Sequence, residues 1–152
     1  RVSPSRENCY ILPMPGELPV QEQSALKMLR NSRLIGVWFD PIRSLVRLTF
    51  AVEPQMQIKI ELNTIVQFNY SNATYEAPSE RTEHYYVGDV VLVPIQDGGQ
   101  KVLTYLNHQF IHQDDYSKVQ YYPSVQLFYL HLDGEVVLDI VGSGYRIERV
   151  QA

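Results

Sequence analysis

Closely spaced apolar runs with the composition of β-strands fill most of this chain, and they constrain the fold more than any other feature. The runs cover residues 34–39, 45–52, 58–68, 85–95, 101–110, 124–132 and 135–141. Over residues 57–62 the apolar side chains alternate strictly with polar ones, which places the two kinds on opposite faces of a strand. Consecutive strands of this kind favour an antiparallel sheet with one buried face and one face in water.

The chain before the first strand has a different character. Residues 1–19 hold four of the nine prolines, which predicts an irregular or extended arm, because proline fixes φ and removes an N–H donor. Residues 20–31 predict the one clear helix, with apolar side chains at positions 25, 26, 28 and 29 and a stop at Asn31-Ser32.

One helix followed by consecutive strands disfavours a parallel βαβ design. We therefore expect an α+β domain over residues 1–152. It would have one N-terminal helix packed on a curved, mainly antiparallel β-sheet or half-barrel of six to eight strands, with residues 34–150 mainly β.

Several turns follow from local chemistry. Asp40-Pro41 starts a turn, since proline presets φ and the Asp side chain bonds to the backbone. Asp133-Gly134 predicts a two-residue type I′ hairpin between two apolar runs. Asn63-Thr64 is expected to interrupt a strand, and residues 142–144 (Gly-Ser-Gly) to end the hairpin before a short last strand. For residues 101–110, periodicity leaves strand and helix both open.

Composition excludes several classes of protein. The net charge of −4 argues against nucleic-acid binding, which relies on basic residues that neutralise phosphates. Cys9 is the single cysteine, so no internal disulfide can form. No run approaches the roughly 18 apolar residues of a membrane span. We expect no membrane association and a cytoplasmic location.

Residues 87–93 (Val-Gly-Asp-Val-Val-Leu-Val) resemble the opening of SH3-like barrels, including Tudor domains, in which a Gly-Asp turn leads into a strand. The aromatic cage and the following strands of a Tudor domain are not recognisable. The resemblance therefore implies no function and no family.

Motifs for catalysis or cofactor binding are weak. There is no phosphate loop, dinucleotide fingerprint or zinc-cysteine pattern, and we expect no cofactor. His108 and His112 are weak metal candidates, because residues four apart share one face of a helix, and Asp114 or Asp115 would supply a third ligand. Without the glutamate of a metalloprotease beside the first histidine, the spacing is also compatible with surface histidines.

The eleven tyrosines are the one compositional excess. Tyrosine suits strands, but it is also enriched at interfaces. Tyr75, Tyr116, Tyr121 and Tyr122 fall at expected loop edges, so we predict that these four form a recognition surface.

Two function hypotheses result. The first is a non-catalytic binding module, of the accessory, inhibitor or immunity type, that recognises a protein partner or a second copy of itself. The alternative is a half-barrel enzyme or ligand-binding protein in which His84, His131 and Asp139 converge inside the sheet.

Overall fold

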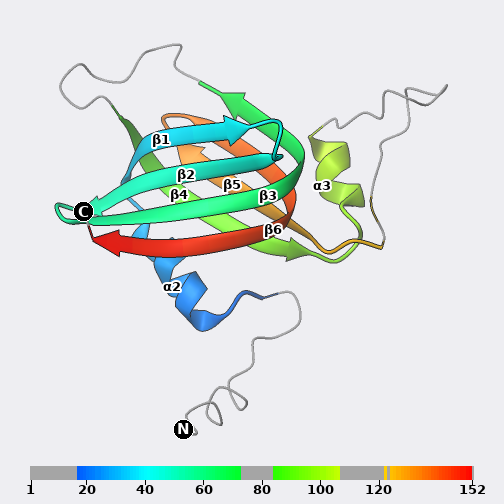
Figure 1. Ribbon diagram of the computed structural model, residues 1–152, viewed down its shortest axis with the longest axis horizontal. Coiled ribbons are helices and arrows are strands. Elements are labelled where there is room, and N and C mark those ends of the chain that lie inside the picture. The colour runs from blue at the N-terminus through cyan, green and yellow to red at the C-terminus, as the bar shows by residue number, and fades with distance from the viewer. Residues whose placement is uncertain (1–16, 73–83, 107–121, 123, 152) are drawn as a thin grey trace, which may run out of the picture.

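The computed structural model describes residues 17–72, 84–106, 122 and 124–151. The predicted α+β class is confirmed, with a short helix packed against an antiparallel sheet (Figure 1). The described elements, in chain order, are α2 (Val20–Met28), β1 (Arg33–Asp40), β2 (Leu45–Glu53), β3 (Met56–Ser71), β4 (Tyr85–Ile95), α3 (Gln100–Tyr105), β5 (Leu127–Gly134) and β6 (Val137–Gln151). Residues 1–16 of the predicted arm lie outside the described residues.

The six strands form one sheet in the order β1-β2-β3-β6-β5-β4, and the sheet closes into a barrel. Every neighbouring pair is antiparallel. The closing contact is short, since β1 and β4 pair only at Arg33 with Tyr86 and at Leu34 with Tyr85. Beyond these two pairs β1 and β4 have no pairing with each other, and the seam between them is the weakest part of the barrel.

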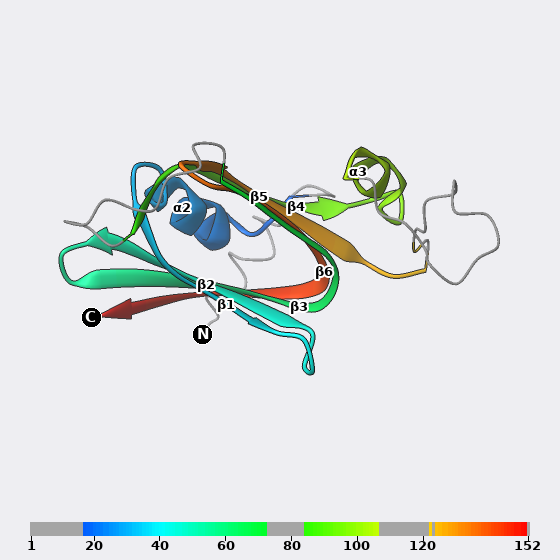
Figure 2. The same cartoon turned by 90° about the horizontal axis from the view of Figure 1, so that it is seen from above.

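A bend in the two longest strands folds the sheet over itself. β3 has 16 residues and β6 has 15, and both run through the bend as continuous strands (Figure 2). Thr64 has a φ of 49°, and the register shifts between Ile65 and Gln67 opposite Gly142. A Cβ atom on Gly142 would lie 2.7 Å from the carbonyl oxygen of Asn63, so only glycine fits there.

This bend corrects two expectations. Asn63-Thr64 does not interrupt β3, and residues 142–144 do not end β6. Both are the bulged part of a continuous ladder, because a β-bulge bends a strand and raises its twist without ending the pairing.

The interior of the barrel is filled by alternate side chains of the strands. Leu48 and Phe50 of β2, Ile58, Ile60 and Leu62 of β3, Leu130 and Leu132 of β5, and Leu138 and Ile140 of β6 are fully buried. The alternation predicted for residues 57–62 is therefore confirmed. Burial of each such side chain stabilises the fold by about 1.5–3 kcal/mol relative to exposure.

Helix α2 packs into the same core through Ala25 and Leu26, with Leu29 just beyond its end. Its C-terminal turn passes through Asn31, at a φ of 65°, and pairs with β4: Asn31 N donates to Val87 O and Val87 N donates to Ser32 O, both at 3.0 Å. The helix is thus shorter than the predicted 20–31, and the last residues form a turn.

Of residues 101–110, for which periodicity left strand and helix open, 101–105 are helical as part of α3, and 107–110 lie outside the described residues. Asp97 shapes its start by accepting hydrogen bonds from the backbone N–H groups of Lys101 and Gly99, both at 3.0 Å. These bonds, that from Lys101 above all, lower the pKa of Asp97. A second apolar cluster seats α3 on the outer face of the sheet and consists of Leu103, Leu106, Leu127 and Val141.

The predicted hairpin between two strands, β5 and β6, is confirmed, but the predicted two-residue turn at Asp133-Gly134 is wrong. Both residues belong to β5 and pair with β4, as Asp133 with Asp89 and Gly134 with Val87. A two-residue turn there would pair Leu132 with Glu135, but Leu132 pairs with Leu138. The glycine is instead required by close backbone packing, because a Cβ atom on Gly134 would lie 2.4 Å from the carbonyl oxygen of Tyr86.

Replacement of Gly134 by alanine tests this packing. The new methyl group meets backbone atoms that cannot move aside, so we expect Gly134→Ala to lower the free energy of unfolding by about 1–3 kcal/mol. Gly36→Ala is the matched control, because its Cβ atom would find its nearest neighbour 3.8 Å away on Thr49. Urea unfolding should leave this control within about 0.5 kcal/mol of the parent protein. Equal losses in the two variants would contradict the close-approach argument.

Candidate functional site

The predicted tyrosine surface lies mostly beyond what the structure describes. Tyr75, Tyr116 and Tyr121 lie outside the described residues, as do the metal candidates His108 and His112 with their acidic neighbours. These remain predictions. Tyr122 is described: it is half-buried, packs against the cluster beneath α3, and its backbone N–H donates to Gly98 O at 2.7 Å.

A polar trio lies on the outer face of β5 and β6. His131 and Asp139 are register partners, and His131 Nδ1 lies 2.7 Å from Asp139 Oδ1. The Tyr129 hydroxyl donates to the same oxygen at 2.5 Å. Only 14% of the Asp139 side chain is exposed, against 37% of the His131 side chain.

The trio therefore forms outside the barrel. The neighbouring residues in sequence, Leu130 and Leu132 on β5 and Leu138 and Ile140 on β6, take the inward positions, and alternation turns the polar side chains outward. The structure thus brings His131 and Asp139 together as the alternative hypothesis expected, but not inside the sheet. Tyr129 was not singled out from the sequence, because its role depends on the β5–β6 register.

An open groove borders the trio. It has a volume of about 560 Å³ and is lined by Val91, Lys101, Val102, Tyr105, Tyr129 and His131. β4 and β5 form its floor, and α3 forms its wall. Apolar walls with a few polar groups at one place are the usual composition of a small-molecule site.

His84 lies apart from this trio, at the seam between β1 and β4. It lines a cavity of about 290 Å³ together with Leu34, Ile35, Gly36, Val37, Tyr70 and Tyr85. Its Nδ1 atom is buried and has no hydrogen-bond partner among the described residues. The three polar residues of the alternative hypothesis therefore occupy two separate places.

The β1–β2 hairpin beside that seam carries a concentrated apolar surface. Val37, Trp38 and Phe39 of β1 are 42%, 44% and 45% exposed, and Ile42 at the tip is 92% exposed. We call these four residues the hairpin surface. Single exposed apolar side chains are ordinary, but four on one hairpin, distributed over both faces of its edge strand and its tip, favour a contact site.

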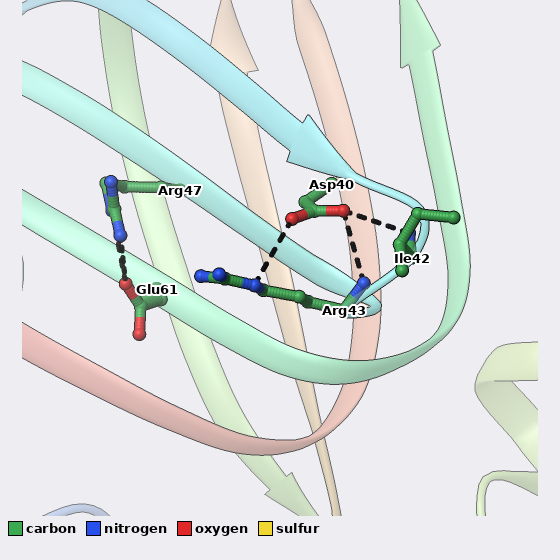
Figure 3. Close-up of polar contacts among 5 residues, drawn as sticks. All are labelled: Asp40, Ile42, Arg43, Arg47 and Glu61. Carbon is green, nitrogen blue, oxygen red and sulfur yellow. Dashed lines mark hydrogen bonds and ion pairs between the residues drawn. The ribbon is translucent and has the colours of Figure 1, made fainter.

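The turn that presents this surface is well fixed. The carboxylate of Asp40 accepts hydrogen bonds from the backbone N–H groups of Ile42 and Arg43, at 2.9 and 3.1 Å (Figure 3). Arg43 Nε lies 3.7 Å from the other Asp40 oxygen. The turn predicted from Asp40-Pro41 is confirmed, together with the side-chain bonds that were expected to hold it.

A row of side chains across the outer face supports Trp38 from β2. The guanidinium of Arg47 lies 4.9 Å from the Trp38 ring centre, within the range of a cation–π contact. Arg47 Nε and Nη2 donate to Glu61 Oε2 at 3.1 and 3.0 Å (Figure 3). The row joins β1, β2 and β3 through side chains in register.

The described residues contain neither a candidate metal cluster nor a candidate membrane-spanning helix. Within residues 17–72, 84–106, 122 and 124–151, no group of three or more His, Cys, Asp or Glu side chains is arranged to hold a metal ion. No helix in the described part of the chain has the length and apolar character needed to cross a membrane.

Comparison with known proteins indicates neither a family nor a function for this chain. No protein-family model and no curated protein matches the chain. A solved structure of an uncharacterized protein from Neisseria gonorrhoeae is similar over 78% of this chain and 91% of its own, with a TM-score of 0.39 and 9% sequence identity. A likeness at that level carries no argument about function.

The hydrogen bond between Tyr129 and Asp139 predicts how the Tyr129 hydroxyl titrates at alkaline pH. Burial, and then the hydrogen bond to Asp139, raise the pKa of Tyr129 above its ordinary value near 10. Because the folded-state pKa is the higher one, the resulting stability is present below pH 10 and is lost as the pH rises toward the raised value. We expect Asp139→Asn to lower the pKa of Tyr129, as measured by NMR titration of labelled tyrosine. Tyr86, which is exposed and lies outside the trio, supplies the internal control, and an unchanged Tyr129 titration would contradict the assigned hydrogen bond.

Proposed function

We propose that this chain is a non-catalytic binding module that recognises a protein partner, and that the partner adds a strand to the free edge of β1. The observation that carries the proposal is the pairing of residues 36–40. They pair with β2 on one side, and no described residue pairs with them on the other. A strand edge with open N–H and C=O groups is a template for another extended chain.

The side chains on this edge support a specific mode of recognition. Val37 and Phe39 face the inner side of the sheet, in register with Leu48 and Val46, and Trp38 faces the outer side, in register with Arg47. A partner strand would hydrogen-bond along the edge through its backbone. Its alternate apolar side chains would contact Val37 and Phe39, while those between would contact Trp38.

The fixed geometry of the hairpin lowers the cost of binding. The Asp40 bonds hold the turn, and Arg47 holds the indole of Trp38. Phe39 packs at 5.4 Å from the ring of Phe68 on β3. Because these side chains are already ordered, a partner would spend less free energy on ordering them when it binds.

The predicted tyrosine surface is a separate part of this proposal. Tyr75, Tyr116 and Tyr121 stay predicted contact residues, since aromatic side chains are common at interfaces, whereas Tyr122 packs against the cluster beneath α3. A second copy of the chain is the competing occupant of the β1 edge.

The test compares peptide binding by two variants, each with lysine in place of a partly exposed valine. Val37→Lys places a charge among the inner side chains of β1, and Val93→Lys is the control on β4, where the valine is 38% exposed. Partners captured by the parent protein are identified, and the binding segment is made as a peptide. We expect Val37→Lys to weaken peptide binding by at least about tenfold, equal to about 1.4 kcal/mol, and Val93→Lys to leave it unchanged.

The result can overturn the proposal in two ways. Equal binding by parent and Val37→Lys proteins would remove the β1 edge from recognition. Concentration-dependent dimerisation that is lost in Val37→Lys but not in Val93→Lys, measured by light scattering, would replace the heterologous partner with a second copy.

A further inference from the structure

We propose that the groove between α3 and the β4–β5 surface binds a small aromatic carboxylate. The inference is independent of partner binding at β1, since the groove is lined by Val91, Lys101, Val102, Tyr105, Tyr129 and His131 and shares no residue with the hairpin surface. It rests on an open groove and on a positioned histidine at its edge.

The walls of the groove suit a flat apolar body. Val91 is 43% exposed and Tyr105 is 75% exposed, so both offer apolar surface that no described residue covers. Tyr129 is the register partner of Val93 and also lines the groove. Aromatic side chains at both Tyr105 and Tyr129 favour a ring as the ligand body, through offset or edge-to-face stacking.

Two polar groups of the groove remain available to a ligand. The Tyr129 hydroxyl and the Nδ1 atom of His131 are both committed to the Asp139 carboxylate. That leaves His131 Nε2, which has no partner among the described residues, and the ammonium group of Lys101. The Lys101 ammonium can donate a charge-assisted hydrogen bond, the stronger kind, to a ligand carboxylate, and His131 Nε2 can donate beside it when the imidazole carries both protons.

Asp139 acts as a positioning residue for this histidine. Its carboxylate is largely buried and accepts from His131 Nδ1 at one oxygen, which fixes the orientation of the ring. Asn69 is the register neighbour of Asp139 on β3 and accepts a hydrogen bond from the Gln67 side chain at 2.8 Å.

The experiment is an NMR titration of the labelled full-length chain with benzoate as the probe. Benzyl alcohol is the uncharged aromatic control, and acetate is the carboxylate control without a ring. We expect saturable shifts of amides in α3, β4 and β5 with benzoate, and an affinity at least about tenfold weaker for either control compound. Saturation at other amides, none at these, or equal affinity for acetate would overturn the proposal.

Two variants separate ligand binding from a purely structural role of the trio. His131→Gln keeps a donor toward Asp139 but removes the second ring nitrogen that faces the ligand, and should weaken benzoate binding by about tenfold. Tyr105→Ala removes an exposed ring without touching the core, and should weaken binding while leaving the unfolding midpoint unchanged. Tyr86→Ala, at a tyrosine 59% exposed outside the groove, is the control. Benzoate affinity that is unchanged in both groove variants would show that the trio only ties β5 to β6.

Discussion

The pairing of β3 with β6 is the constraint on which the rest of this structure depends. It is the longest ladder in the sheet, and it continues through the bulge at Thr64 and the glycine opposite. Because both strands fold over together, the part of the sheet that holds β1 and β2 comes to lie over the part that holds β4 and β5 (Figure 2). One apolar interior can then be filled from both sides, with α2 packed into it.

That arrangement determines where polar side chains can lie. The inward positions of the strands are taken by Leu, Ile, Val and Phe side chains, so polar groups are displaced to the outer face and to the ends of the barrel. The His131–Asp139 pair is the clearest case, since it stands on the opposite side of the strand from buried leucines. The seam is the other consequence: β1 meets β4 at only two residue pairs and then extends past it as a hairpin.

The sequence predicted those features that depend on local pattern. The alternation in residues 57–62, the limits of β4 and the Asp40 turn all follow from side-chain chemistry within a few residues.

Features that depend on strand register could not be predicted from the sequence. Asp133-Gly134 has the composition of a hairpin turn, but pairing with β4 extends β5 through it and moves Leu132 from Glu135 to Leu138. That change of register by three positions brings Asp139 opposite His131, so the polar trio could not be predicted. The closure of the sheet is also nonlocal, since it joins strands separated by the whole of β2 and β3.

Amide hydrogen exchange along β1 tests the free edge most directly. N–H groups that point toward β2 are hydrogen-bonded, and those that point away have no described partner, so protection should alternate along residues 36–40. The matched segment of β2, paired on both sides, should be protected throughout. Slow exchange at every amide of residues 36–40 in the isolated protein would contradict an open edge and, with it, strand addition as the mode of recognition.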